Sequence, residues 1–323
     1  MSGPPAAPEG SPSRRWLGRG LLLVLATAIV SGVSTFVNGY AVAGTGSDAF
    51  VTVRNALVAF ALVPAAVLVA RRASVRPTAR EAGLLAVIGL VGGAIPFLLF
   101  FHGLALAAAA GATTSASFVY RLLFLFATLL GVVVLAERAR PRLVVAGLLL
   151  LAGNALLLAL TGPLWSDGTG FVLAATVLWA VEYTLSKRLL RRLPSTVVGA
   201  GRMGFGAAIL GSYLVLAGEA SAPLGFSMAT WGWIGVSALL LGAFVATWYA
   251  GLARVDLGTA ATVLVLGYPV TWLLALAVRG GPAPWGPAVG ALLVAGGVAA
   301  AIGASGARAI RAAVAPTGGA RAG

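Results

Sequence analysis

Ten apolar stretches, each long enough to cross a bilayer, occupy most of the chain. A transmembrane helix needs about 20 mostly apolar residues at about 1.5 Å rise per residue. Hydrophobic residues make up 60% of the 323 residues and charged residues 9%, whereas soluble domains carry about 25% charged residues. The sequence therefore predicts an all-α polytopic membrane protein with ten transmembrane helices, at about 17–37, 49–70, 83–104, 111–136, 143–161, 169–190, 196–217, 231–252, 259–278 and 286–304.

The basic residues fall in short clusters between these stretches. If the N-terminus is cytoplasmic, 18 Lys and Arg residues lie on the inner side and only Arg279 lies on the outer side. Such an excess of inner positive charge sets the orientation of membrane proteins. We expect a cytoplasmic (inner) membrane protein with both termini in the cytoplasm. Because the clusters do not gather on one solvated face, the net charge of +14 does not indicate a nucleic-acid partner.

The residues that most enzymes and pumps require are absent from the sequence. There is no cysteine, and the one histidine, His102, argues against a histidine-built metal site. No phosphate loop, HExxH motif or GxSxG motif is present, so ATP hydrolysis and hydrolytic chemistry lack their residues. We expect no catalytic residues, no metal, no cofactor and no enzymatic activity.

An internal repeat appears when the first half is slid by 148 positions. It divides the chain into a first five-helix repeat at 14–162 and a second at 168–305, with disordered cytoplasmic tails predicted at 1–13 and 306–323. Since five is odd, the two repeats must cross the membrane in opposite directions, an architecture typical of secondary transporters. The matching pairs include Gly20 with Gly168, Arg54 with Arg202, Gly103 with Gly251, Thr114 with Thr262 and Tyr120 with Tyr268.

Two stretches also carry a family resemblance. TVLWAVEYTLSKRL (176–189) opens the second half, and LLGVVVLAERARPRLVVAGLLLLAG (129–153) combines a helix, an acidic turn, a basic turn and a glycine-containing helix. Together they resemble the EamA branch of the drug/metabolite transporter superfamily, over about residues 15–305. The resemblance implies efflux or exchange of a metabolite or drug across the cytoplasmic membrane.

The sequence departs from the family pattern at both acidic turns. The first turn has Ala136-Glu137 in place of Gly-Glu, and its second-half equivalent is Arg279-Gly280. The second half therefore lacks the carboxylate of the pattern.

Three predicted spans carry polar residues along one helical face. These faces comprise Thr27, Ser31, Ser34 and Asn38; Thr114, Ser117, Arg121 and Thr128; and Thr176, Trp179, Glu182, Tyr183 and Ser186. Two interpretations stay open. The faces line a shared cavity, or they pack helices together through small residues and hydrogen bonds to their own backbone.

Charged residues inside a span are costly and usually face a cavity or a partner. We expect Arg121 and Glu182 to face a central cavity, where they pair with each other or bind a charged substrate. The alternative is a fixed ion pair between spans four and six. Arg54 and Arg202 lie closer to span ends, so snorkelling to the interface is the favoured interpretation for both. His102 is expected at the interface, and Pro96 and Pro269 are candidate hinges.

We predict a secondary transporter of a small organic solute, an exporter or exchanger that works by alternating access. The alternatives are an uncoupled facilitator and a non-transporting lipid-binding or assembly protein. The expected partners are a small-molecule solute and the lipid bilayer, with a homodimer left open. The candidate substrate pathway comprises Ser31, Ser34, Asn38, Ser117, Tyr120, Arg121, Trp179, Glu182, Tyr183, Trp248, Tyr249 and Tyr268.

Overall fold

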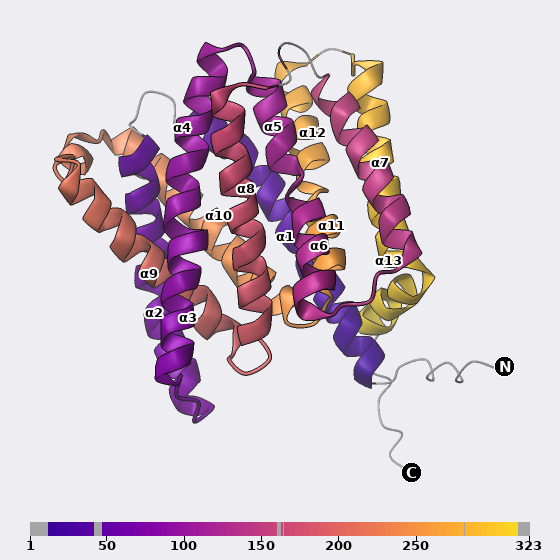
Figure 1. The fold of residues 1–323 in the computed structure, drawn as a ribbon, viewed down its shortest axis with the longest axis horizontal. Coiled ribbons are helices and arrows are strands. Elements are labelled where there is room, and N and C mark those ends of the chain that lie inside the picture. The colour runs from indigo at the N-terminus through magenta and orange to yellow at the C-terminus, as the bar shows by residue number, and fades with distance from the viewer. Residues whose placement is uncertain (1–11, 42–46, 160–162, 164, 281, 316–323) are drawn as a thin grey trace.

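The computed structural model describes residues 12–41, 47–159, 163, 165–280 and 282–315, which form a bundle of helices (Figure 1). The third span is interrupted by a π-helical segment, η1, and the fourth span is broken at Leu122. The first half contains α1 (Pro12–Ala41), α2 (Ser47–Arg72), α3 (Ala79–Ile88), η1 (Gly89–Ala94), α4 (Ile95–Ala109), α5 (Thr113–Arg121), α6 (Leu123–Leu135) and α7 (Pro141–Leu158).

The second half has the same number of spans. Its elements are α8 (Asp167–Leu189), α9 (Ser195–Leu216), the short 3-10 helix η2 (Ala222–Gly225), α10 (Met228–Leu252), α11 (Leu257–Leu264), α12 (Gly267–Arg279) and α13 (Trp285–Val314). In the described part of the chain, ten helical segments are long and apolar enough to cross a membrane. The predicted all-α fold with ten spans in two five-helix repeats is confirmed.

The C-terminal end differs from the sequence prediction. Residues 306–314, expected to be disordered, continue α13 beyond a kink at Gly303, which has a φ of 63°. This segment is rich in alanine and arginine, which favour helix, and it buries Gly306 and Ala309. A Cβ placed on Gly18 of α1 would overlap the Ala309 backbone, so packing against α1 holds the segment. The remaining tail predictions, at 1–11 and 316–323, lie outside the described residues, and α1 already begins at Pro12.

Glycine pairs bring the two repeats together at equivalent crossings. The helix α8 packs along α4, and its symmetry equivalent, α1, packs along α10. A Cβ on Gly103 would lie 2.7 Å from the carbonyl oxygen of Gly168, and a Cβ on Gly251 would lie 3.2 Å from that of Gly20. Small residues permit such close backbone approach between membrane helices. The four glycines that match in the repeat therefore also form two equivalent contacts, each joining one repeat to the other.

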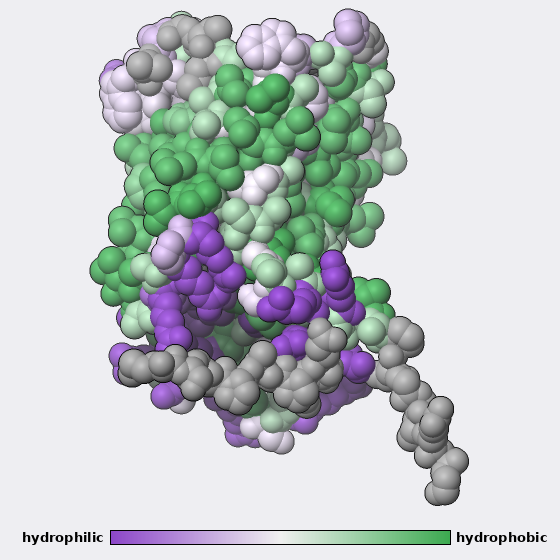
Figure 2. Space-filling view, turned by 90° about the vertical axis from the view of Figure 1, so that its right-hand side faces the viewer, coloured by the Kyte–Doolittle hydropathy of each residue, from purple (hydrophilic) through white to green (hydrophobic). Residues whose placement is uncertain are grey.

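On the face shown in Figure 2, the surface is apolar around the middle of the bundle. Within the spans, large apolar side chains are widely exposed, including Phe60 at 83%, Leu148 at 64% and Leu292 at 72%. Exposure on this scale fits lipid rather than water. Hydrophilic residues gather at the end of the bundle where α1 begins and α13 ends (Figures 1 and 2).

Candidate functional site

A cavity of about 620 Å³ lies between the two repeats. Eight of the ten spans contribute to its wall, and the exceptions are α7 and α13. The lining residues are Ser31, Ser34, Thr35, Asn38, Arg54, Phe97, Phe100, Phe101, Leu104, Ser117, Tyr120, Arg121, Trp179, Tyr183, Arg202, Leu241, Phe244, Tyr268 and Thr271.

Trp179 of α8 is the centre of an aromatic wall in this cavity. The centroid of its ring lies 5.4 Å from that of Phe97, 5.5 Å from that of Phe100 and 5.4 Å from that of Tyr120. Tyr120 continues the wall to Tyr268, with centroids 6.3 Å apart. These edge-to-face contacts between repeats are favourable for aromatic rings and hold the wall in place.

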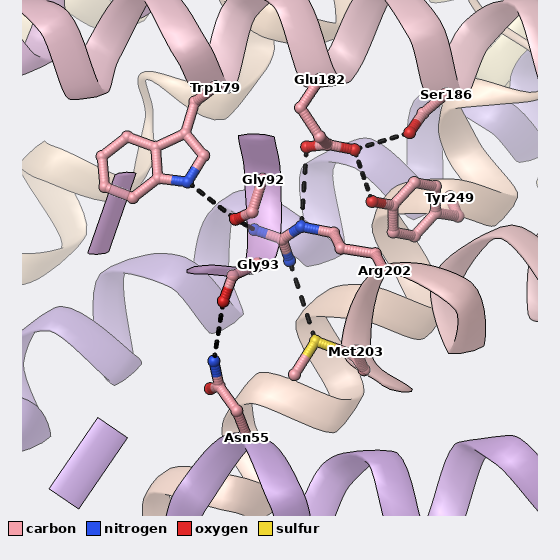
Figure 3. Close-up of polar contacts among 9 residues, drawn as sticks. All are labelled: Asn55, Gly92, Gly93, Trp179, Glu182, Ser186, Arg202, Met203 and Tyr249. Atoms are coloured by element: carbon pink, nitrogen blue, oxygen red, sulfur yellow. Dashed lines mark hydrogen bonds and ion pairs between the residues drawn. The ribbon is translucent and has the colours of Figure 1, made fainter. Parts of the chain in front are cut away.

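A backbone carbonyl freed by Pro96 anchors two side chains of the second repeat. An α-helix would bond the N–H of residue 96 to the carbonyl of Gly92, but proline has no N–H, and the segment before it is π-helical. Trp179 Nε1 and Arg202 Nη2 donate instead to the Gly92 oxygen, at 3.1 and 3.0 Å (Figure 3). The helix break in span three thus positions the site, and the sequence showed only its proline.

Arg202 and Arg54 are both buried, with exposed fractions of 5% and 6%. The prediction that they snorkel to the interface is wrong, because each finds polar partners inside the protein. Arg54 donates from Nε and Nη2 to Asn55 Oδ1, at 3.3 Å each, and its guanidinium carbon lies 5.5 Å from the Phe97 ring centroid. Asn55 in turn donates to the Gly93 carbonyl at 3.4 Å. Both arginines line the cavity.

Glu182 is fully buried and lies behind the cavity wall. Ser186 Oγ and Tyr249 Oη donate to its Oε1 at 2.6 and 2.7 Å, and Arg202 Nε lies 3.6 Å from its Oε2 (Figure 3). The expected pairing of Glu182 with Arg121 is therefore wrong. A Cβ on Gly92 would overlap the Glu182 side chain, so a glycine is needed opposite this carboxylate.

Arg121 lies at the C-terminal end of α5 and has only neutral partners among the described residues. Its Nη1 donates to Asn154 Oδ1 at 3.1 Å, and its guanidinium carbon lies 4.1 Å from the ring centroid of Tyr268. Asn154 is oriented by its own hydrogen bond to the Leu150 carbonyl at 2.8 Å. The guanidinium is therefore fixed in the cavity wall between a ring and an amide.

Nine of the twelve predicted pathway residues line the cavity: Ser31, Ser34, Asn38, Ser117, Tyr120, Arg121, Trp179, Tyr183 and Tyr268. The other three, Glu182, Trp248 and Tyr249, do not line it. Trp248 packs behind Tyr183, with ring centroids 4.5 Å apart. His102 is exposed and meets the Phe171 ring edge-on at 4.9 Å, away from the cavity.

Sequence reasoning missed several lining residues. The phenylalanines Phe97, Phe100 and Phe101 resemble lipid-facing residues in an apolar span, and no local pattern separates the two roles. For Arg54 and Arg202 a signal existed in the sequence, because the two arginines match each other in the repeat.

Polar contacts join the loops and helix ends at the end of the bundle where α1 begins. The carboxylate of Glu137 accepts from the backbone N–H groups of Leu257 and Gly258, at 2.8 and 3.3 Å, and so caps α11. Lys187 Nζ donates to the carbonyls of Leu252 and Val255 at 2.5 and 2.7 Å, near the end of α10. The acidic turn of the first half thus has a structural partner in the second.

Comparisons with known proteins agree on the fold. The EamA-like transporter family matches the sequence twice, over residues 18–159 and 167–303. A solved structure titled "Crystal structure of protein" is 20% identical, with a TM-score of 0.69, over 87% of this chain and 96% of that one. A search of the curated proteins found no match. Since the two family matches cover most of the chain, this protein belongs to the EamA-like transporter family.

Proposed function

We propose that the protein is a secondary transporter that moves a small organic solute across the cytoplasmic membrane by alternating access, as an exporter or exchanger. The observation that carries this proposal is the cavity of about 620 Å³, whose wall is drawn from both repeats. Sites of this kind, between inverted repeats, are where secondary transporters bind their solutes. With the orientation set by the basic residues, both termini lie in the cytoplasm.

The contacts at the end where α1 begins support a gate. Glu137, Lys187 and the ion pair between Arg140 and Asp256, at 3.3 Å, all join the first repeat to the second or tie α8 to α10. Breaking a few such polar contacts would open a path from the cavity to this end. The arrangement fits a state in which the cytoplasmic side is closed.

The surroundings of Glu182 argue against proton coupling through this carboxylate. A proton carrier has to meet water or solute during the cycle. Glu182 instead has no exposed surface and is bonded to Ser186 and Tyr249 and paired with Arg202.

Reconstitution into liposomes tests the proposal. Vesicles loaded with a pooled metabolite extract are diluted into empty buffer, with and without a proton gradient, and the solutes that leave are identified by mass spectrometry. We expect protein-dependent release of a restricted set of small organic solutes. Release no faster than from protein-free vesicles would contradict transport.

A matched pair of variants on α1 tests whether the solute passes through this cavity. Ser31→Trp fills the cavity and should abolish release, whereas Ile29→Trp adds the same bulk at a residue that is 56% exposed on the outer surface and should leave it unchanged. Equal release by the two variants would remove this cavity from the pathway.

A further inference from the structure

We propose that the cavity selects a solute with an anionic group, such as a carboxylate, joined to a flat aromatic or apolar body. This inference rests on the proposed function and specifies the class of its substrate. Three arginines and no acidic residue line the cavity.

The positive charge of the cavity is only partly compensated. Arg202 has Glu182 as its ion-pair partner. Arg54 and Arg121 donate instead to the neutral amide oxygens of Asn55 and Asn154, and no carboxylate of the described residues lies within 4.0 Å of either. A charge taken out of water is costly unless an opposite charge meets it. A bound anion would supply that charge.

Arginine also favours particular anions. Its planar fork of N–H donors matches the two oxygens of a carboxylate or the oxygens of a phosphate. Arg121 is only half-buried, and a single one of its nitrogens is used by Asn154, so it is the group placed to contact the anion. Arg54, also of the first repeat, is more deeply buried and adds positive potential to the cavity wall.

The aromatic wall of the cavity indicates what the uncharged part of the solute is. Trp179 meets Phe100 and Tyr120 edge to face. Phe97 and Tyr268 extend this surface toward Arg54 and Arg121. A flat apolar body would bury its surface against these rings. A volume of about 620 Å³ accommodates a small organic molecule.

Three probes that share a body and differ in charge test the inference: 3-phenylpropanoate, 3-phenylpropan-1-ol and 3-phenylpropylamine. Binding to the purified protein in nanodiscs is measured by calorimetry against protein-free nanodiscs. We expect 3-phenylpropanoate to bind at least about tenfold more tightly than the alcohol, and the amine to bind weakest.

Variants assign the preference to the arginines. Arg121→Gln should remove the preference for the anion, and Arg121→Lys should restore part of it, because the charge returns without the fork. Arg54→Gln should weaken it less. Arg254→Gln is the control, since Arg254 stacks on Trp16 outside the cavity and its loss should change nothing. Thermal unfolding of each variant identifies those that fail to fold. The preference for the anion is then compared among the variants that do fold.

The outcomes separate this inference from the proposed function. Equal binding of the three probes, a preference for the amine or alcohol, or no binding of any of them would overturn the anionic class. Release of only cationic or neutral solutes from liposomes would also overturn it, while transport itself would stand. Binding of the anion with no protein-dependent flux would support the site and contradict transport.

Discussion

Arg54 and Arg202 occupy equivalent positions in the two repeats, yet their surroundings differ. Around Arg202 the side chains pack into a closed network with a buried carboxylate, whereas Arg54 faces the cavity with an amide for a partner. The repeat offset pairs Glu182 with Ser34, Ser186 with Asn38, and Tyr249 with Phe101. The first member of each pair belongs to the network, and the second lines the cavity.

This difference has two sources. Part of it is chemical, since the second repeat carries a carboxylate where the first carries a hydroxyl. The other part is conformational, because in inverted repeats an open half and a closed half can exchange their arrangements. The predictions below separate the two sources.

The largest effect is expected at the buried carboxylate. Glu182→Gln leaves the Arg202 guanidinium without its counter-charge and should lower the free energy of unfolding by about 3–5 kcal/mol, as for other broken buried pairs. Chemical denaturation in detergent measures it. The double variant Glu182→Gln with Arg202→Gln should recover part of this loss. If the double variant is as unstable as the sum of the two single variants, the ion pair does not couple these residues.

Placing a carboxylate at the equivalent position makes the first repeat resemble the second. Ser34→Glu puts an acid among the cavity residues and should lower the affinity for 3-phenylpropanoate by at least about tenfold, because the acid competes for the arginines. Ser34→Gln, similar in size but uncharged, is the control. Calorimetry in nanodiscs measures both, and an equal loss in the two variants would indicate crowding rather than charge.

The helix break of span three has no counterpart in the second repeat, where Phe244 stands at the position equivalent to Pro96. Pro96→Ala restores the N–H that can bond the Gly92 carbonyl, in competition with Trp179 and Arg202. We expect release from liposomes to slow by several-fold with little change in stability. Pro64→Ala, at an exposed proline inside α2, should leave the rate unchanged. Equal rates for wild type and Pro96→Ala would show that the break is not needed.

The smallest effect concerns one hydroxyl. Tyr249→Phe reproduces the aromatic ring found at the equivalent Phe101 and removes a hydrogen bond to Glu182, which should cost about 1 kcal/mol of stability. Tyr213→Phe removes an exposed and longer bond to Asp48, at 3.4 Å, and should cost close to nothing. Denaturation midpoints compare the two. A loss as large for Tyr213→Phe would argue against a special role for the buried network.

Local patterns were sufficient for the spans and for many site residues. A span requires a continuous apolar stretch, and the polar faces of α1 and α8 follow from helical spacing, so Ser31, Ser34, Trp179 and Tyr183 could be predicted. The ion-pair partner of Glu182 could not be predicted from the sequence. Arg121 and Arg202 are both cations inside spans, and only the distance in the folded protein selects which one meets Glu182. The helical segment 306–314 was missed because its stability depends on packing against α1.

The sequence by itself determined that the chain crosses a membrane ten times in two opposed repeats. The lengths of the apolar stretches, the positions of the basic residues and the matching glycines are all features of the order of residues. The tertiary structure alone decided which arginine meets the buried carboxylate. That outcome depends on the Gly92 carbonyl, because Pro96 has no N–H to bond it. The Gly92 oxygen instead accepts hydrogen bonds from Trp179 and Arg202 of the other repeat. Hydrogen bonds between distant segments are set by geometry in three dimensions, and no spacing along one helix encodes them.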